Sequence, residues 1–368
     1  MTKLGVIMRA TPASGGTYQY SLSMLEALRD ARGYDITVYG DLLNPDLARL
    51  GYGVRSFAES RAMQAAYLAA DALGVPLPDR FADEDVVIAP TYCLALLHTR
   101  KPFAYTLHDL QEFHYPQNFT ALQRNFRRSV YLRLSKRARQ IVCESEYVKS
   151  DIVRLLDVSA DRVAVITAPP LLPERGTMKL EAVRARLGLP ERFIFYPAQF
   201  WPHKNHLRLV EAFRQIVARE PDLKLVLTGR ERDEYHAVMR AIGDAGLERN
   251  VQHLGYIEQA DLQAIYHLAL ALVMPSLFES VSIPVYEAFQ AGTPVVASNI
   301  LSFPEQVGDA GLLFDPLSSS AIAESVLRVV GDPALARTLV ERGRARMVAM
   351  TPQRYSGQLQ SMLLGMLG

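Results

Sequence analysis

The strongest constraint on this chain is a regular alternation of short apolar runs with longer amphipathic segments. Short apolar runs are typical of buried strands, and apolar residues at helical spacing are typical of helices packed on a sheet. Repeated β-α-β units fold into a mostly parallel, doubly wound sheet. In the first half, strands are predicted at residues 4–8, 36–39, 86–89, 103–107, 140–143 and 163–167.

The alternation is interrupted once and then restarts. Residues 168–176 contain Pro169, Pro170 and Pro173, which cannot continue a helix or a central strand, so we expect a linker here. After it, strands are predicted at residues 193–196, 223–228, 251–254, 270–274, 294–298 and 312–314. The sequence therefore predicts an α/β fold of two Rossmann-like, doubly wound domains that face each other across a cleft.

Helices are predicted between these strands. In the first half they span residues 17–29, 57–73, 121–139 and 146–156, and in the second they begin near residues 205, 233, 259, 283 and 318. We expect domains at residues 1–170 and 171–350. The last helical stretch, in residues 351–368, has no strand after it, so we expect it to pack back on the first domain.

Composition narrows the class of protein. A length of 368 residues suits two domains, and 40 basic against 39 acidic residues give no overall charge that would attract nucleic acid. Cys93 and Cys143 lack a CxxC spacing, which indicates a reduced chain without a thiolate metal site. No apolar run reaches the roughly 18 residues of a membrane span, and the first run is too short for a signal peptide. We expect a cytoplasmic protein.

Two glutamates, Glu279 and Glu287, lie eight residues apart between a predicted strand and the following helix. In an open α/β sheet, this junction is where phosphorylated ligands bind. Two carboxylates repel phosphate but accept hydrogen bonds from hydroxyls, so the pair suggests a sugar nucleotide. The alternative is that both are ordinary solvated acids.

Three other features lie at equivalent junctions. Gly15 and Gly16 follow the first strand and would let the backbone approach an anion, or would simply form a tight turn. Lys204 stands at a predicted helix start, where the helix dipole disfavours a cation unless a phosphate is bound; the alternative is a solvated lysine. His108 ends a strand and could contact a substrate hydroxyl, or could be a buried histidine bonded to Asp109.

The segment 122–139 is strongly basic, with seven lysines and arginines and no acidic residue. Leu122, Phe126, Val130 and Leu134 recur every four residues and predict one apolar stripe. Such a helix can lie peripherally on an anionic membrane or bind a pyrophosphate-bearing acceptor. It can equally pack on the sheet with a solvated outer face, and the sequence leaves both readings open.

Three motifs occur together here: Glu-x7-Glu from Glu279 to Glu287, the segment 197–205 that ends in Lys204-Asn205, and the segment 287–298. In this order they resemble the family 4 (group 1) retaining glycosyltransferases of the GT-B fold, over essentially the whole chain. The resemblance implies a hexosyltransferase, with Lys204 on the donor diphosphate, Glu279 on the hydroxyls of the transferred sugar and Glu287 on the ribose.

The resemblance also implies roles for further residues. Backbone N–H groups of Ser280, Val281, Ser282 and Ile283 would hold the phosphate, Tyr256 and Ile257 would border the base, Gly15 and Gly16 would approach the diphosphate, and His108 would lie near the sugar. No metal or other cofactor is expected. The family usually has an arginine where this chain has Gln199, and we expect Arg230 or His203 to supply the missing charge. The family's Gly-Phe-Gly after the first glutamate is here Ser280-Val281-Ser282.

We therefore expect transfer of a hexosyl unit, mannosyl by preference, from a GDP- or UDP-linked donor to an acceptor hydroxyl. The expected acceptor is a glycan or a lipid-linked glycan in cell-surface polysaccharide assembly, at the inner face of a membrane. Two alternatives remain from the residues themselves: a sugar-nucleotide epimerase or phosphorylase on the same architecture, and a non-catalytic sugar-nucleotide-binding protein.

Overall fold

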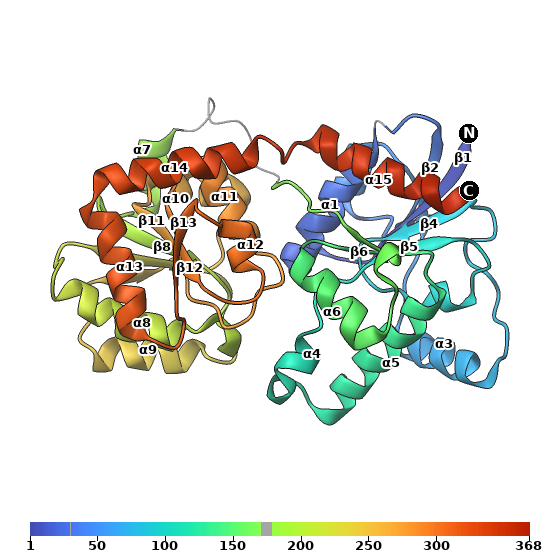
Figure 1. The fold of residues 1–368 in the computed structure, drawn as a ribbon, viewed down its shortest axis with the longest axis horizontal. Coiled ribbons are helices and arrows are strands. Elements are labelled where there is room, and N and C mark those ends of the chain that lie inside the picture. The colour runs from blue at the N-terminus through green and yellow to red at the C-terminus, as the bar shows by residue number, and fades with distance from the viewer. Residues whose placement is uncertain (30, 171–178) are drawn as a thin grey trace. The chain divides into compact units, whose positions relative to one another are not determined.

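A computed structural model describes residues 1–29, 31–170 and 179–368. The chain divides into two compact units, residues 1–169 with 350–368, and residues 170–349. Residues 171–176 of the predicted linker lie outside the described residues. Each unit is an α/β sheet structure (Figure 1).

The first unit is built on a seven-stranded parallel sheet with the strand order β3-β2-β1-β4-β5-β6-β7. Its strands are β1 Thr2–Met8, β2 Tyr34–Gly40, β3 Gly53–Ser56, β4 Val86–Ala89, β5 Phe103–Thr106, β6 Gln140–Cys143 and β7 Val163–Val165. Its helices are α1 Gly16–Arg29, α2 Pro45–Leu50, α3 Arg61–Leu73, α4 Gln111–His114, α5 Ala121–Arg137, α6 Glu146–Leu156 and α15 Pro352–Leu367.

The second unit is built on a six-stranded parallel sheet with the order β10-β9-β8-β11-β12-β13. Its strands are β8 Phe193–Pro197, β9 Lys224–Thr228, β10 Val251–His253, β11 Ala271–Met274, β12 Val295–Ser298 and β13 Gly311–Phe314. Its helices are α7 Leu180–Leu187, α8 His206–Val217, α9 Tyr235–Asp244, α10 Gln259–Leu268, α11 Ile283–Ala291, α12 Phe303–Val307, α13 Ser319–Gly331 and α14 Pro333–Met347.

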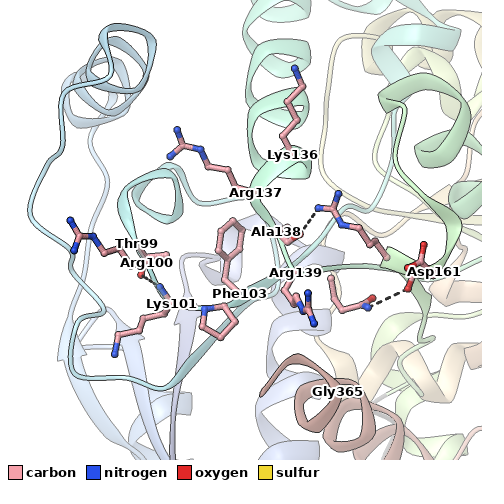
Figure 2. Close-up of a pocket in the computed structure, with 13 residues that line it drawn as sticks. Thr99, Arg100, Lys101, Phe103, Lys136, Arg137, Ala138, Arg139, Asp161 and Gly365 are labelled. Carbon is pink, nitrogen blue, oxygen red and sulfur yellow. Dashed lines mark hydrogen bonds between the residues drawn. The ribbon is translucent and has the colours of Figure 1, made fainter. Parts of the chain in front are cut away.

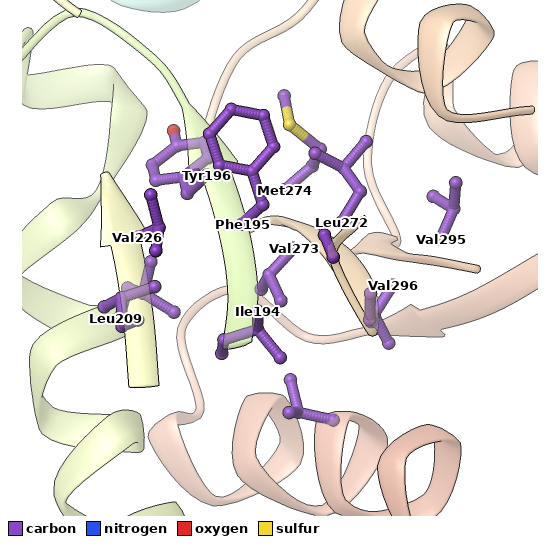
Figure 3. Close-up of a cluster of buried hydrophobic side chains, with 14 of the residues drawn as sticks. Ile194, Phe195, Tyr196, Leu209, Val226, Leu272, Val273, Met274, Val295 and Val296 are labelled. Carbon is purple, nitrogen blue, oxygen red and sulfur yellow. The ribbon is translucent and has the colours of Figure 1, made fainter. Parts of the chain in front are cut away.

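The core of the second unit explains why its strands read as continuous apolar runs. Ile194, Phe195, Val273 and Val296 are fully buried on neighbouring strands (Figure 3). In a parallel sheet covered by helices on both faces, successive side chains all enter apolar layers, so the usual alternation with polar residues disappears. The predicted fold class is confirmed, and every strand predicted from the sequence is present.

Some predicted boundaries were wrong. Strand β3 was missed because it is a short edge strand whose residues stay largely exposed, which leaves no apolar signal. The helix predicted from residue 57 begins at Arg61, after Ser60, whose side chain accepts a bond from Met63 N at 3.2 Å. Phe57 instead packs in the core, with its ring centroid 5.8 Å from that of Phe81. Helices α2, α4, α7, α12 and α14 had no counterpart in the prediction.

The basic helix also differs from its prediction. It ends at Arg137, and the N–H of Arg139 already donates to Phe103 O beside strand β5. Val130 and Leu134 of the predicted apolar stripe are buried, but Leu122 is 81% exposed. Phe126 is partly buried against the same core, so the stripe runs from Phe126 to Leu134 and leaves out only Leu122.

Most arginines of α5 have partners within the first unit. Arg127 pairs with Asp109 and Glu112, at 2.8 and 2.9 Å. Arg133 and Arg137 both pair with Asp71, on α3. Much of the positive charge of this helix therefore holds neighbouring elements together.

The last helix, α15, belongs to the first unit and packs on α1. Tyr355, Leu359 and Leu363 are buried, and Ser356 Oγ donates to Ala27 O at 2.5 Å. No helix in the described ranges combines the length and the apolar character needed to cross a bilayer.

Candidate active site

The candidate site in the second unit lies where the strand order reverses. Strand β8 is central, the chain continues to β9 and β10 on one side, and it returns to β11 on the other. Crevices at such a switch point, outside the carboxyl ends of the strands, are where open α/β sheets bind ligands. The donor residues predicted in this unit lie on the loops after β8, β9, β10 and β11 and on α11.

The loops after β8 and β11 are fixed to each other by Asn205. Its backbone is left-handed, with φ 61°, and its side-chain amide donates to Pro275 O and to Pro316 O, both at 2.9 Å. Leu277 N also donates to His203 O at 2.7 Å. Lys204 thus ends a short 3-10 turn, Pro202–Lys204, and is separated by Asn205 from the first residue of α8, His206.

Lys204 and Glu279 are in direct contact. The Lys204 Nζ donates to Glu279 Oε1 at 2.5 Å, and the side chains are only 20% and 11% exposed. The alternative that these two residues are solvated surface groups is therefore wrong. The pair brings an ammonium group and a hydroxyl acceptor to one point, as a ligand with a diphosphate and a sugar requires.

One residue of the segment after Glu279, Ser282, has its backbone groups already bonded. Ser282 N donates to Gln306 Oε1 at 3.0 Å, and Gln306 Nε2 donates to Ser282 O at 2.6 Å. In this structure Gln306 of α12 accepts the N–H of Ser282, so a phosphate would have to replace Gln306 there. Among the described residues, no partner takes the N–H group of Val281, in the loop before α11, or that of Ile283, the first residue of α11. The sequence could not reveal Gln306 as a partner, since it lies 24 positions away.

Glu287 is buried rather than solvated, with 5% exposure. It accepts a hydrogen bond from Tyr266 Oη at 2.6 Å and another from Gln259 Nε2 at 3.1 Å. Burial raises the pKa of this carboxyl, against the lowering effect of the two donors. Gln259 is half-buried, so it is the partner that a ribose hydroxyl could replace.

Two arginines after β9 contact two of the remaining predicted residues, Tyr256 and Gln199. The Arg230 guanidinium lies over the ring of Tyr256, 4.9 Å from its centroid, and Tyr256 is 63% exposed. Ile257 is half-buried against the core. Gln199 accepts a bond from Arg232 Nε at 2.8 Å. Sequence reasoning missed Arg232, although a second arginine two positions after Arg230 was a signal that could have found it.

In the first unit, the two ring nitrogens of His108 both face oxygens. Nδ1 lies 2.9 Å from Glu144 Oε2, and Nε2 lies 2.9 Å from Pro90 O. Burial by itself lowers the pKa of His108, but the bond to Glu144 and its charge outweigh it, so the pKa is raised. An imidazolium can donate from both nitrogens, which this environment favours. The alternative partner, Asp109, is wrong, since it pairs with Arg127 instead.

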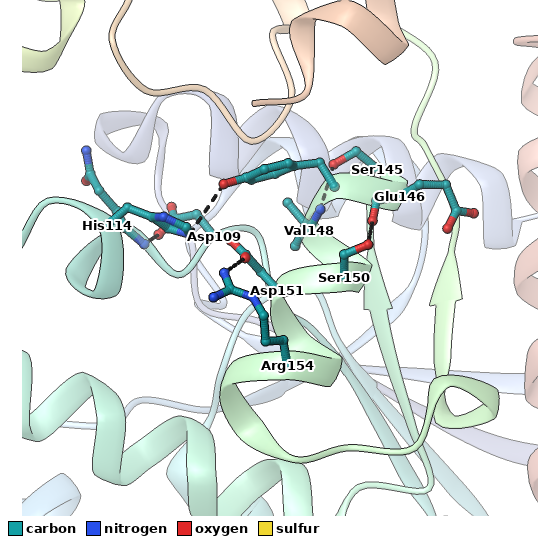
Figure 4. A network of polar contacts seen from close by, with 10 residues as sticks. Asp109, His114, Ser145, Glu146, Val148, Ser150, Asp151 and Arg154 are labelled. Atoms are coloured by element: carbon teal, nitrogen blue, oxygen red, sulfur yellow. Dashed lines mark hydrogen bonds and ion pairs between the residues drawn. The ribbon is translucent and has the colours of Figure 1, made fainter. Parts of the chain in front are cut away.

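A polar network fixes the short helix that follows His108 (Figure 4). His114 Nε2 lies 2.5 Å from Asp151 Oδ2, and Arg154 donates to the other oxygen of Asp151 at 2.7 Å. Asp109 accepts a bond from Gln111 N at 3.1 Å. These contacts join α4 to α6 and so define the backbone on the carboxyl side of β5.

The glycine pair stands at the start of α1, after β1, as predicted. Gly15 has φ 60° and ψ −125°, a conformation that side chains disfavour, and Gly16 is the first residue of α1. Gly15 O accepts the N–H groups of Tyr18 and Gln19, which begin the helix. Gly15 is therefore needed for the conformation of this turn, independently of any ligand.

Comparison with known proteins agrees with this geometry. Residues 181–346 match the family described as glycosyl transferases group 1, and residues 14–168 match glycosyltransferase family 4. The chain is 28% identical over 257 residues to O-antigen chain mannosyltransferase B of Escherichia coli, covering 68% of this chain and 67% of that protein. It is 24% identical over 319 residues to O-antigen chain mannosyltransferase RfbU of Salmonella typhimurium, covering 84% and 86%.

Solved structures share the fold. HepE of Anabaena, in complex with UDP and glucose, superposes with a TM-score of 0.79 at 18% identity, over 99% of this chain and 100% of that one. WaaG, a glycosyltransferase involved in lipopolysaccharide biosynthesis, superposes with a TM-score of 0.72 at 15% identity, over 98% and 100%. With both halves matched by family models, this chain is a glycosyltransferase and belongs to family 4, group 1, of the GT-B fold.

Proposed function

We propose that this glycosyltransferase moves a hexosyl unit, mannosyl by preference, from a nucleotide diphosphate sugar to a glycan hydroxyl in polysaccharide assembly, with retention of configuration. The contact between Lys204 and Glu279 carries the proposal. It supplies a cation for the diphosphate and a carboxylate for the sugar hydroxyls. The similarity to two O-antigen mannosyltransferases supports the choice of sugar and the kind of acceptor.

Donor binding would proceed by exchange of partners. In the structure the Lys204 ammonium is neutralised by Glu279. A diphosphate oxygen would take over the ammonium, and the released carboxylate of Glu279 would accept hydrogen bonds from the sugar. Glu287 would bond the ribose after Gln259 moves away. Each charged group then has a partner both before and after binding, which keeps desolvation costs low.

In the chemical step, the bond between the anomeric carbon and the diphosphate oxygen breaks and its electron pair stays on the oxygen. The acceptor hydroxyl oxygen bonds to the same face of the anomeric carbon, and its proton passes to the departing phosphate oxygen. Lys204 would stabilise the charge that develops on the diphosphate, which is typically the largest contribution to catalysis. The proposal requires no metal, because side chains and the start of α11 supply the positive potential.

The experiment is a thermal-shift panel with GDP, UDP and their mannose and glucose conjugates, followed by a transfer assay. A ligand at about a hundred times its dissociation constant should add about 2.7 kcal/mol of stability. We expect one sugar nucleotide to stabilise the protein and the α-anomer to appear in the product spectrum. If no GDP- or UDP-linked sugar changes the melting temperature, the proposal is wrong.

A basic pocket supports the further proposal of peripheral membrane contact. It is a cavity of about 720 Å³ at the amino ends of β5 and β6, the edge of the first sheet opposite to His108 (Figure 2). Six basic side chains line it against one acidic one: Arg100, Lys101, Lys136, Arg137, Arg139 and Arg162 against Asp161. Arg137 is paired with Asp71, but for the described part of the chain no ion pair involves Arg100, Lys101, Lys136 or Arg139.

The contact would be with phosphate headgroups of an anionic bilayer, and it would use this pocket rather than the whole segment 122–139. Co-sedimentation with vesicles tests it. Lys136→Glu/Arg139→Glu should abolish binding to vesicles that contain phosphatidylglycerol, whereas the control Arg328→Glu/Arg337→Glu, at two exposed arginines of the second unit, should bind like wild type. Equal binding by both double variants would contradict the proposal.

A further inference from the structure

The positive charge of Lys204 is too small to balance the negative charge of the proposed ligand. A nucleotide diphosphate sugar carries two negative charges, and breaking its anomeric bond adds a third. Lys204 provides one positive charge, and it stands beside the carboxylate of Glu279 at 2.5 Å. A second cation within reach of the same loop would offset this deficit, and the described residues contain a candidate.

The candidate is on the loop after β9, which is tightly joined to the loop after β8. Phe200 N donates to Arg230 O at 3.3 Å, and Glu234 N donates to Phe200 O at 3.0 Å. At Gly229, with φ 125°, an added Cβ would lie only 2.4 Å from Ala198 O. The two loops therefore approach as closely as backbones can, and residues 230–234 are fixed relative to Lys204.

From the loop after β9, the side chain of Arg232 contacts the loop after β8, which carries Lys204. Its Nε donates to Gln199 Oε1 at 2.8 Å, and its guanidinium carbon lies 5.2 Å from the ring centroid of Trp201. Gln199, Trp201 and Lys204 share one tight turn, in which Trp201 N donates to Gln199 O and Lys204 N donates to Trp201 O. Arg232 and Lys204 are thus held by the same short stretch of backbone.

Arg232 also has hydrogen-bonding capacity to spare. The hydrogen bond to Gln199 occupies only the Nε of Arg232, and no carboxylate of the described residues forms an ion pair with this guanidinium. The two terminal nitrogens form a planar fork, which suits two oxygens of a phosphate better than an ammonium group does. Arg230 differs, because it is exposed and lies over Tyr256.

We infer that Arg232 is the second cation of the diphosphate site, oriented by Gln199 and Trp201. This inference rests on the proposed function of the same site. It assigns Gln199 a positioning role, in which its amide oxygen holds Nε and leaves the fork free. It also replaces the expectation that Arg230 or His203 supplies the missing charge.

Binding of GDP and UDP, compared with GMP and UMP, tests the inference without any acceptor. Arg232→Ala should weaken the diphosphate about a hundredfold and leave the monophosphate nearly unchanged, since a single phosphate can stay on Lys204. Arg230→Ala is the matched control and should not discriminate between the two. Arg232→Gln, which keeps a donor to Gln199, serves if the alanine variant folds poorly, and it should show the same selective loss.

A relocated arginine provides the sharper test. The double variant Gln199→Arg/Arg232→Ala should recover diphosphate affinity and transfer, because the new arginine starts from the residue that Arg232 contacts, in the turn that carries Lys204. Equal loss of monophosphate and diphosphate in Arg232→Ala, or wild-type affinity for both, would overturn the inference. The proposed function would survive that result if Lys204→Ala still reduced transfer strongly, and both would fail if wild type bound neither GDP nor UDP.

Discussion

The ammonium nitrogen of Lys204 lies 2.5 Å from Oε1 of Glu279, although the two residues are 75 positions apart in the chain. The contact joins the loop after β8 to the loop after β11, on the two sides of the switch point of the second sheet. Each partner satisfies the charge of the other until a ligand separates them. This relationship makes the roles of the two residues separable by experiment.

Lys204→Ala should reduce kcat/KM about a hundred- to thousandfold, because one cation on the leaving group contributes roughly 3 kcal/mol. Steady-state transfer assays check this, with circular dichroism as the test of folding. The control is Lys224→Ala, which removes a lysine at the amino end of β9 whose Nζ donates to Arg249 O. Wild-type turnover in the Lys204 variant would refute its assignment.

Glu279→Gln should separate the nucleotide from the sugar. The neutral amide no longer holds Lys204, so affinity for the nucleoside diphosphate should stay equal or increase. Affinity for the sugar nucleotide should fall toward that of the diphosphate alone, since the charged acceptor for the hydroxyls is lost. Calorimetric titration with both ligands measures the difference, and equal weakening of both would contradict the exchange of partners.

Glu287→Gln should stabilise the protein at high pH. Burial raises the folded-state pKa of Glu287, so its favourable protonated state is lost as pH rises through that pKa, and the ionised form then carries a desolvation cost. The amide avoids this cost. The melting temperature of the variant should exceed that of wild type at pH 8, and the difference should shrink toward pH 4.

Tyr266→Phe is the companion to that measurement. It removes the hydrogen bond of 2.6 Å from Tyr266 to Glu287, which lowers the pKa of this carboxyl in wild type. The pKa of Glu287 should therefore rise further, and the protein should lose more stability than wild type at high pH. Leaving a buried acceptor unpaired should cost about 1–3 kcal/mol. A pH-independent loss of stability would show that the tyrosine acts by packing alone.

Glu144→Gln should weaken the protein at acidic pH. The bond and charge of Glu144 raise the pKa of His108, so this contact contributes stability that is fully present below the unfolded histidine pKa, about 6.5, and is lost as pH rises through the folded value. Thermal melts from pH 5 to pH 9 should show a deficit for the variant at the acidic end. NMR titration of the His108 ring should give a lower pKa than in wild type.

Asn205 allows its side chain and its backbone to be tested apart. Asn205→Gly keeps the left-handed conformation and loses the two bonds to Pro275 and Pro316, whereas Asn205→Ala loses both features. The alanine variant should therefore be the less stable by about 1 kcal/mol in urea unfolding. Equal stability of the two variants would mean that the positive φ imposes no strain.

The fold was predictable because its signal is local. Strands such as β8 and β11 are buried on both faces and read as apolar runs, and Pro169 with Pro170 marks the interruption between the two halves. Strand β3 escaped prediction because an edge strand with exposed side chains needs no apolar residues. Helix α12 was not predicted because its five residues are too few to show a helical period.

By itself, the sequence determined the two α/β units and the junctions where Lys204, Glu279 and Glu287 stand, because strand and helix patterns depend on neighbouring residues. Only the tertiary structure decided what those groups contact: Glu279 for Lys204, Glu144 for His108 and Arg232 for Gln199. These partners come from different β-α units, and nothing in the local pattern records which loops meet at the edge of a sheet. The packing of the helices on the sheet brings the loops together, and so sets the charges of the site.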